Sequence, residues 1–295
     1  MTKQKKDIFK IANQKLKKNK IIQAIILSSL IANNTPLIAE NINSAQPETI
    51  EDTMSPELNI TCTEEYIEEA NKLKSMLDEL QLQNKYSEYI ISELAKNNTQ
   101  IKIVKTNGSN LYYDNTIYIN GEKIKSAKST YEKQSIKESV MHESIHMLQN
   151  KLNIMDDISK LPPKEAICLY LFSELDATVK AYVACDKYYE TDTEERVNSS
   201  LTAISNIVSY AMKTYIEKAI YLNTEKEYTT NASTTKNILE KFNSMGNLPK
   251  LNLDNIVDDI YKKIPDDYKE RIQTLNNEYF EKGITLQNQK DIASK

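Results

Sequence analysis

Two histidines stand four residues apart in the stretch VMHESIHMLQ, residues 140–149, and a glutamate follows the first. They are the only histidines in the 295-residue chain. On a helix, residues i and i+4 lie on one face, so His142 and His146 can each direct a ring nitrogen at one point. Such a point suits Zn²⁺, which binds imidazole nitrogens at about 2.0–2.1 Å. In the H-E-x-x-H pattern the glutamate, here Glu143, is the general base that activates a metal-bound water.

The local sequence predicts that this motif lies on a helix. Residues 129–153, STYEKQSIKESVMHESIHMLQNKLN, contain no Gly or Pro, and Ser129 or Thr130 can cap the start. The two histidines flank a stripe of apolar residues close to the 3.6-residue period, so we expect them to be partly buried. Buried imidazoles without a partner are costly, whereas a metal ion satisfies them. The apolar stripe consists of Ile136, Val140, Met141, Ile145, Leu148 and Leu152.

The third ligand of such a zinc site has to come from another segment. A catalytic zinc takes three protein ligands and keeps one position open; no histidine remains, so the third is a carboxylate or, as second choice, a thiolate. The helix predicted over residues 162–190 carries two carboxylates in apolar surroundings, Glu174 and Asp176. They point about 200° apart and cannot both bind one ion. We predict Glu174 as the ligand and Asp176 as a carboxylate that orients a ligand or a helix. The alternatives are the reverse assignment, or a salt bridge from Glu174 to a lysine.

The combination of HESIH with ELDA, whose glutamate lies 28 residues after His146, resembles the gluzincin branch of zinc metallopeptidases. More narrowly, it resembles uncharacterised bacterial metallopeptidase domains that carry an E-x-D-A helix. The similarity covers about residues 63–190. Gluzincins of the thermolysin type stabilise the oxyanion with a further histidine, which this chain lacks, so the resemblance implies that a Tyr or Arg takes that role. Tyr182, two turns beyond Glu174, is the candidate.

The expected fold class is α+β, predominantly α, with a zincin-like domain over residues 63–190 and a small antiparallel sheet. Residues 63–98 predict one long amphipathic helix that Thr63 can cap. The next segment, 101–124, alternates in polarity and is rich in Ile, Val, Tyr and Thr, which is typical of strands. If the resemblance holds, an edge strand pairs with an extended substrate. The expected strands are 101–105, 111–113 and 116–120.

The C-terminal part of the chain predicts helices, whereas the N-terminal part bears on where the protein is located. Residues 191–295 predict a helical C-terminal extension, with helices beginning near Asp192, in TTKNILEKFNSMG, in LDNIVDDIYKKI and in PDDYKERIQTLNNEYFEKGI. Residues 1–39 combine a lysine-rich start with the apolar run IIQAIILSSLIA, which indicates either a secretory signal or a basic amphipathic segment. The run is too short for a stable membrane span. We favour export to the periplasm or medium, with a cytoplasmic location as the alternative. Residues 40–62 are predicted to be a linker.

The net charge and the cysteines of the chain bear on its partners and on disulfide bonds. A formal net charge of −4, without a patch of basic and aromatic residues, gives no reason to expect nucleic acid as a partner. The three cysteines, Cys62, Cys168 and Cys185, form no C-x-x-C pair, and their odd number does not indicate a disulfide framework. Cys168 and Cys185 lie on one predicted helix about 25 Å apart along its axis, so they cannot form a disulfide with each other.

These observations together predict a zinc-dependent metallopeptidase that binds one Zn²⁺ and acts on a peptide or protein substrate. The first alternative is a helical binding or structural protein that keeps the zinc without catalysis. The second is a coincidental motif on a helical scaffold. Metal content distinguishes the second alternative from the other two, and the chemistry of Glu143 distinguishes the peptidase from the binding protein.

Overall fold

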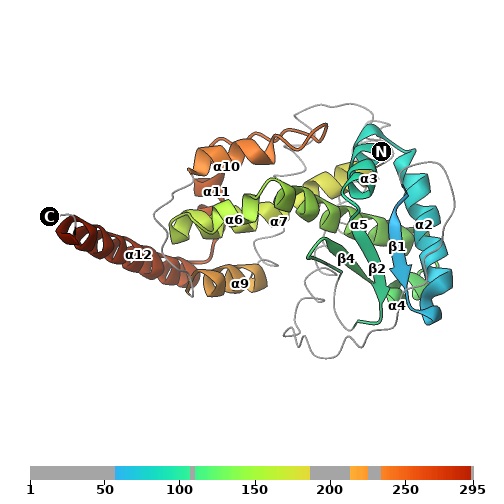
Figure 1. Cartoon of the computed structure of the whole chain (residues 1–295), viewed down its shortest axis with the longest axis horizontal. Coiled ribbons are helices and arrows are strands. Elements are labelled where there is room, and N and C mark those ends of the chain that lie inside the picture. The colour runs from blue at the N-terminus through green and yellow to red at the C-terminus, as the bar shows by residue number, and fades with distance from the viewer. Residues whose placement is uncertain (1–56, 107–109, 187–212, 225–233, 294–295) are drawn as a thin grey trace, which may run out of the picture.

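The computed structural model describes residues 57–106, 110–186, 213–224 and 234–293. This part of the chain is mostly helical and contains one four-stranded sheet, which confirms the α+β class with predominance of α (Figure 1). The predicted signal or amphipathic segment at the N-terminus, most of the predicted linker and the first part of the helix predicted to begin near Asp192 lie outside the described residues. No helix of the described part is long and apolar enough to cross a bilayer.

The segment expected to be one long helix is divided into three pieces. A 3-10 turn, η1 (Glu64–Tyr66), leads into α2 (Ile67–Gln81), and α3 (Lys85–Lys96) begins a new helix. The break occurs because the side chain of Asn84 accepts the backbone N–H groups of Tyr86 and Ser87, which starts a helix where the first would have continued. The prediction of a single helix was therefore wrong.

The sheet has the strand order β1-β2-β4-β3 and is mixed rather than antiparallel. Strands β2 (Gln100–Val104), β3 (Leu111–Tyr113) and β4 (Thr116–Asn120) occupy the predicted positions, and β3 pairs antiparallel with β4. Between these two strands, Asp114 and Asn115 have φ values of 48° and 55°. Two consecutive positive φ angles are typical of a two-residue type I′ hairpin.

The other two strand pairs are parallel, and one strand was not expected. β1 (Asn59–Cys62) pairs parallel with β2, and β2 pairs parallel with β4. The parallel arrangement follows from the connection, because η1, α2 and α3 between β1 and β2 form a crossover long enough to return the chain in the same direction. The prediction that residues 40–62 are a linker was wrong for residues 59–62.

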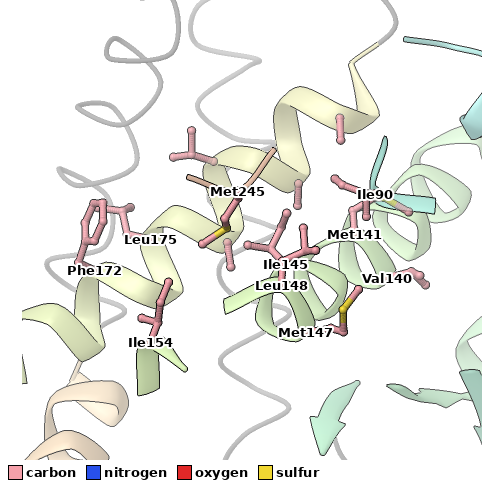
Figure 2. Packing of buried hydrophobic residues seen from close by; sticks show 14 of the residues in the cluster. Ile90, Val140, Met141, Ile145, Met147, Leu148, Ile154, Phe172, Leu175 and Met245 are labelled. Atoms are coloured by element: carbon pink, nitrogen blue, oxygen red, sulfur yellow. The ribbon is translucent and has the colours of Figure 1, made fainter. Parts of the chain in front are cut away.

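Two long helices carry the histidines and the candidate third ligand. α5 (Thr130–Lys151) begins at a capping box, in which Ser129 and Glu132 each bind the other's backbone N–H. α7 (Pro163–Cys185) begins with a proline, which lacks the N–H that a first helical residue cannot use. The short helix α6 (Ile154–Ile158) joins them. α5 and α7 pack along one another, and Figure 2 shows part of the buried cluster that they share. Its labelled members include Val140, Ile145 and Leu148 from α5 and Phe172 and Leu175 from α7.

The described C-terminal part is helical, as predicted. It consists of α9 (Lys213–Thr224), α10 (Thr235–Phe242), α11 (Ile256–Lys263) and α12 (Asp266–Ala293). α9 and α11 pack on α7, so this region shares the core that contains the histidine helix. α12 projects away from the remaining elements (Figure 1) and continues past Gly283, beyond the stretch in which the sequence predicted a helix. The three cysteines are free, and Cys168 and Cys185 are buried.

Candidate metal centre

The two histidines of α5 and the glutamate of α7 converge on one point. The Nε2 atoms of His142 and His146 lie 3.0 Å apart. Oε2 of Glu174 lies 3.4 Å from the first of these nitrogens and 3.5 Å from the second. The three side chains form a group that could hold a metal ion. They are only 15–18% exposed, so the point that they surround is largely shielded from water.

The triangle formed by these three atoms has the size that a tetrahedral ion requires. With bonds of about 2.0–2.1 Å, two ligand atoms of a tetrahedral ion are separated by about 3.3–3.4 Å. The three observed separations, 3.0, 3.4 and 3.5 Å, fall on either side of that value. The three atoms are therefore spaced as the ligands of one such ion would be.

A hydroxyl group orients the ring of His142. Thr178, one turn after Glu174 on α7, donates its only hydroxyl hydrogen to the Glu174 carbonyl at 2.8 Å. Its oxygen therefore acts as the acceptor for Nδ1 of His142, at 3.3 Å. Because Nδ1 then carries the hydrogen of the neutral ring, Nε2 of His142 has a free lone pair directed at the common point.

An amide orients the ring of His146 in the same way. The NH₂ group of Gln149 donates to the Ser173 carbonyl at 3.0 Å and to Oδ2 of Asp176 at 3.1 Å. This fixes the amide so that Oε1 faces Nδ1 of His146, at 2.8 Å, and accepts its hydrogen. In their neutral forms, both imidazoles thus direct unprotonated Nε2 atoms at the common point. Two lone pairs and a carboxylate at one point repel each other unless a cation or a proton lies between them.

The electrostatics of the centre show the same demand for positive charge. Burial by itself lowers the pKa of His146, but the Glu174 carboxylate, with a smaller contribution from Glu143, raises it to about 9. Burial alone raises the pKa of Glu174, but the two imidazoles outweigh it and hold that pKa well below the usual range of a carboxyl. Without a metal, a proton on His146 therefore takes the place of the cation.

Glu143 lies beside the centre and contacts the sheet. Its Oε2 accepts the backbone N–H of Tyr112 at 2.8 Å, on the edge strand β3. Burial raises the pKa of Glu143, although the two neighbouring imidazoles act in the opposite direction. Glu143 is not among the three residues of the metal-binding group, as expected for a glutamate that acts beside an ion rather than on it.

The tyrosine that lies next to Glu174 and Glu143 is Tyr215, from a helix that carries none of the predicted site residues. The hydroxyl of Tyr215, near the start of α9, forms a hydrogen bond with Glu174. Burial, followed by the charges of Glu174 and Glu143, raises the pKa of Tyr215 well above its ordinary value, so the hydroxyl keeps its proton. The earlier candidate, Tyr182, lies about 12 Å further along the axis of α7 than Glu174. In the sequence, only the amphipathic character of α9 indicates that Tyr215 packs against another helix.

Asp176, the alternative third ligand, does not join the group of ligand atoms. It is completely buried, and its carboxylate contacts Gln149 and Lys180. The structure therefore brings together the three residues predicted to bind the metal and places Asp176 behind one of them, where it orients the amide that orients His146. Gln149 was missed in the sequence, although its spacing three residues after His146 puts it on the same side of the helix.

In comparisons with known proteins, no family model, no curated protein and no solved structure matches the chain. Function therefore has to be inferred from the side chains of the centre and from the elements that hold them.

Proposed function

We propose that the protein is a zinc-dependent metallopeptidase with His142, His146 and Glu174 as zinc ligands and Glu143 as the general base. The observation that carries the proposal is the convergence of three ligand atoms while both Nδ1 atoms are already committed to acceptors. A surface helix with incidental histidines would have no need for two orienting partners. The same observation argues against a coincidental motif.

The donor set favours zinc among the common cations. Two imidazoles and one carboxylate are a typical set for catalytic zinc, and three protein ligands leave the fourth tetrahedral position open. Calcium and magnesium prefer sites made of oxygen atoms, which this one is not. When bound, zinc acts as a Lewis acid that makes water a better nucleophile and polarises a carbonyl group.

Glu143 has the position and the environment of a base. The Tyr112 amide holds Oε2, which leaves Oε1 to accept a proton from a water molecule near the triad. A carboxyl whose pKa is raised by burial accepts a proton more readily than one in water and can then deliver it to the leaving amine. Tyr215 keeps its proton, and its hydroxyl could stabilise negative charge developing on the carbonyl oxygen by turning from Glu174 to that oxygen.

The arrangement of elements supports a zincin-like domain and a peptide substrate. The histidine helix lies against the edge strand β3, and the helix that carries Glu174 follows it in the chain. Leu111 and Tyr113 of β3 are 40% and 68% exposed, so this edge offers apolar side chains to a partner. The Tyr112 N–H is occupied by Glu143, so an extended peptide would have to use other groups of the strand or displace this hydrogen bond.

The alternative is a zinc-binding protein without catalysis. It would explain the ligands and their orienting partners equally well, but it gives no reason for a partly buried carboxyl and a partly buried tyrosine to lie beside the same point. The peptidase accounts for both groups, so we prefer it.

The variant Glu143→Gln tests the proposal. It should keep one equivalent of zinc and a folded protein, while hydrolysis of an unfolded protein substrate falls by about 10²-fold or more, as expected for the loss of a positioned base. Zinc content is measured by atomic spectroscopy and hydrolysis by the release of labelled peptides. The matched control is Glu138→Gln, which alters another buried glutamate of α5; its pKa is raised by burial to about 7, so glutamine resembles its protonated form.

The wild-type protein and Glu143→Gln together distinguish the peptidase from its alternatives. If the wild-type protein binds zinc and hydrolyses nothing in a broad panel, the binding protein becomes the better assignment. If Glu143→Gln also loses zinc, Glu143 is a ligand and the proposed division of roles is wrong.

A further inference from the structure

A chain of buried polar groups leads from the metal centre into the protein. Behind His146 lie Gln149, Asp176 and Lys180, each with no exposed surface. Nζ of Lys180 is 2.7 Å from Oδ1 of Asp176, one turn earlier on α7. This contact is an ion pair without the angles of a hydrogen bond, and Oδ1 accepts no hydrogen bond from the described residues. The charge of Asp176 is thus balanced inside the protein.

Lys180 continues the chain to α10, which is distant in the sequence. Its ammonium group donates to the carbonyl of Phe242 at 2.8 Å and contacts the sulfur of Met245 at 3.7 Å. Phe242 is the last residue of α10, and the last carbonyls of a helix have no partner within the helix. A cation at that end also interacts favourably with the helix dipole. Lys180 therefore satisfies an otherwise unpaired carbonyl and holds the end of α10 against α7.

The same turn of α10 is also attached to the histidine helix. Nζ of Lys241 donates to the carbonyl of Leu152, the residue that caps the end of α5, at 2.7 Å, and to Oδ2 of Asp157 at 2.6 Å. The ring of Phe242 packs edge to face on Phe172 of α7, with the ring centres 4.8 Å apart. Consecutive residues of α10 thus contact both helices that supply the metal ligands.

We propose that Lys180 is a positioning residue that couples the metal centre to α10, so that metal binding and the docking of α10 stabilise each other. The proposal rests on the proposed metal site. If α10 separates from α7, the ammonium group loses the Phe242 carbonyl and Asp176 is no longer held in place. The amide of Gln149 then loses its fixed partner, and His146 loses the acceptor that keeps its Nε2 directed at the metal. Coupling of this kind is reciprocal, because each event must favour the other by the same factor.

Two measurements on the full chain test the proposal. The first is the zinc affinity of the variant Asp176→Asn/Lys180→Met, determined by competition with a chelator. This nearly isosteric pair removes both charges and keeps an acceptor for Gln149, but it breaks the connection to α10. We expect the zinc affinity to fall by about 10-fold, at the lower end of the effects of outer partners on metal sites. Lys137→Met is the matched control, because it removes a buried lysine of α5 that pairs with Glu79.

The imidazole spectrum provides a second readout that a general loss of stability would not produce. Since the chain has two histidines, a nitrogen–proton correlation spectrum contains two rings. In the zinc-loaded double variant we expect the Nδ1 proton of His146 to shift and to exchange faster with water. The Nδ1 proton of His142, which Thr178 binds, should stay unchanged and serves as the internal reference.

The reciprocal measurement needs no variant. Hydrogen exchange of the wild-type protein should show greater protection of the amides of α10 with zinc than without, by more than the change in α2. If the wild type binds zinc but α10 protection does not respond, and the double variant binds zinc as tightly as the wild type, the coupling is refuted while the metal site stands. A wild type that binds no zinc would overturn both.

Discussion

Two carboxylates two residues apart on α7 have their charges balanced in different ways. Asp176 is completely buried and has a lysine of the same helix at 2.7 Å. Glu174 is 15% exposed, and its ion-pair partners in the described part of the chain are the two imidazoles. One carboxylate is neutralised by the protein itself, whereas the other needs a proton or a metal ion. The difference shows why burial of an acidic side chain does not by itself indicate a ligand: the decisive question is which cation is already present.

The largest effect is expected when the carboxylate without an internal cation is changed. In Glu174→Gln, zinc loses its only charged ligand, and the zinc affinity should fall by roughly 10²–10⁴-fold. In free energy, this loss is about a third of what proteins gain when they bind zinc. Chelator competition measures the affinity, and circular dichroism checks that the helices remain. An unchanged affinity would mean that the third ligand lies elsewhere in the chain.

The other carboxylate should act on stability instead. Asp176→Asn leaves the ammonium of Lys180 buried without a counter-charge, which should lower the free energy of unfolding of the metal-free protein by about 3–5 kcal/mol. Urea denaturation measures this change. Adding Lys180→Met should restore most of the loss, because a buried pair replaced as a whole by uncharged groups costs little. If the double variant is no more stable than the single one, the pair is not the source of the effect.

The difference between Glu174 and Asp176 could be predicted only in part from the sequence. The helical pattern puts apolar neighbours around both Glu174 and Asp176, so periodicity could not separate them. The spacing of Asp176 and Lys180 at i and i+4 on one face is the signal that an internal ion pair is available to one of them. The histidine pair was predictable because its geometry is local. Gln149 has similarly local geometry, but a glutamine has too many roles to be chosen from its spacing alone.

The rest of the site depends on contacts that no local pattern encodes. Tyr215 reaches Glu174 from α9, and the Phe242 carbonyl reaches Lys180 from a helix about 60 residues further along the chain. In the fold, α5 and α7 were predictable from a capping box and a proline at their starts. β1 was not, because four residues in a polar segment become a strand only when β2 is there to pair with them.

The smallest of the three effects is the pH dependence of stability, which distinguishes a proton bound at the centre from a metal ion bound there. In the metal-free protein, the pKa of His146 is raised from 6.5 to about 9, so its contribution to stability is complete below pH 6.5 and is lost as the pH rises through 9. The pKa of Glu174 is lowered from 4.5, so its contribution is present above pH 4.5 and is lost in acid. The contribution of this pair to the free energy of unfolding should therefore be largest between pH 4.5 and 6.5 and fall by up to about 3 kcal/mol towards pH 9.

Zinc should reverse this dependence, because it competes with the proton of His146 for the same lone pair. The increase in Tm caused by a fixed excess of zinc should be larger at pH 8.5 than at pH 6, where the metal has to displace a proton first. Thermal denaturation at the two pH values, with and without zinc, measures both trends. Asp176 provides the contrast, because it does not belong to the group of ligand atoms: Asp176→Asn/Lys180→Met should keep both trends, whereas Glu174→Gln should weaken both. If the metal-free protein is equally stable at pH 6 and pH 8.5, the Glu174 carboxylate does not stabilise a proton on His146. The contrast between Glu174 and Asp176 would then have no electrostatic basis.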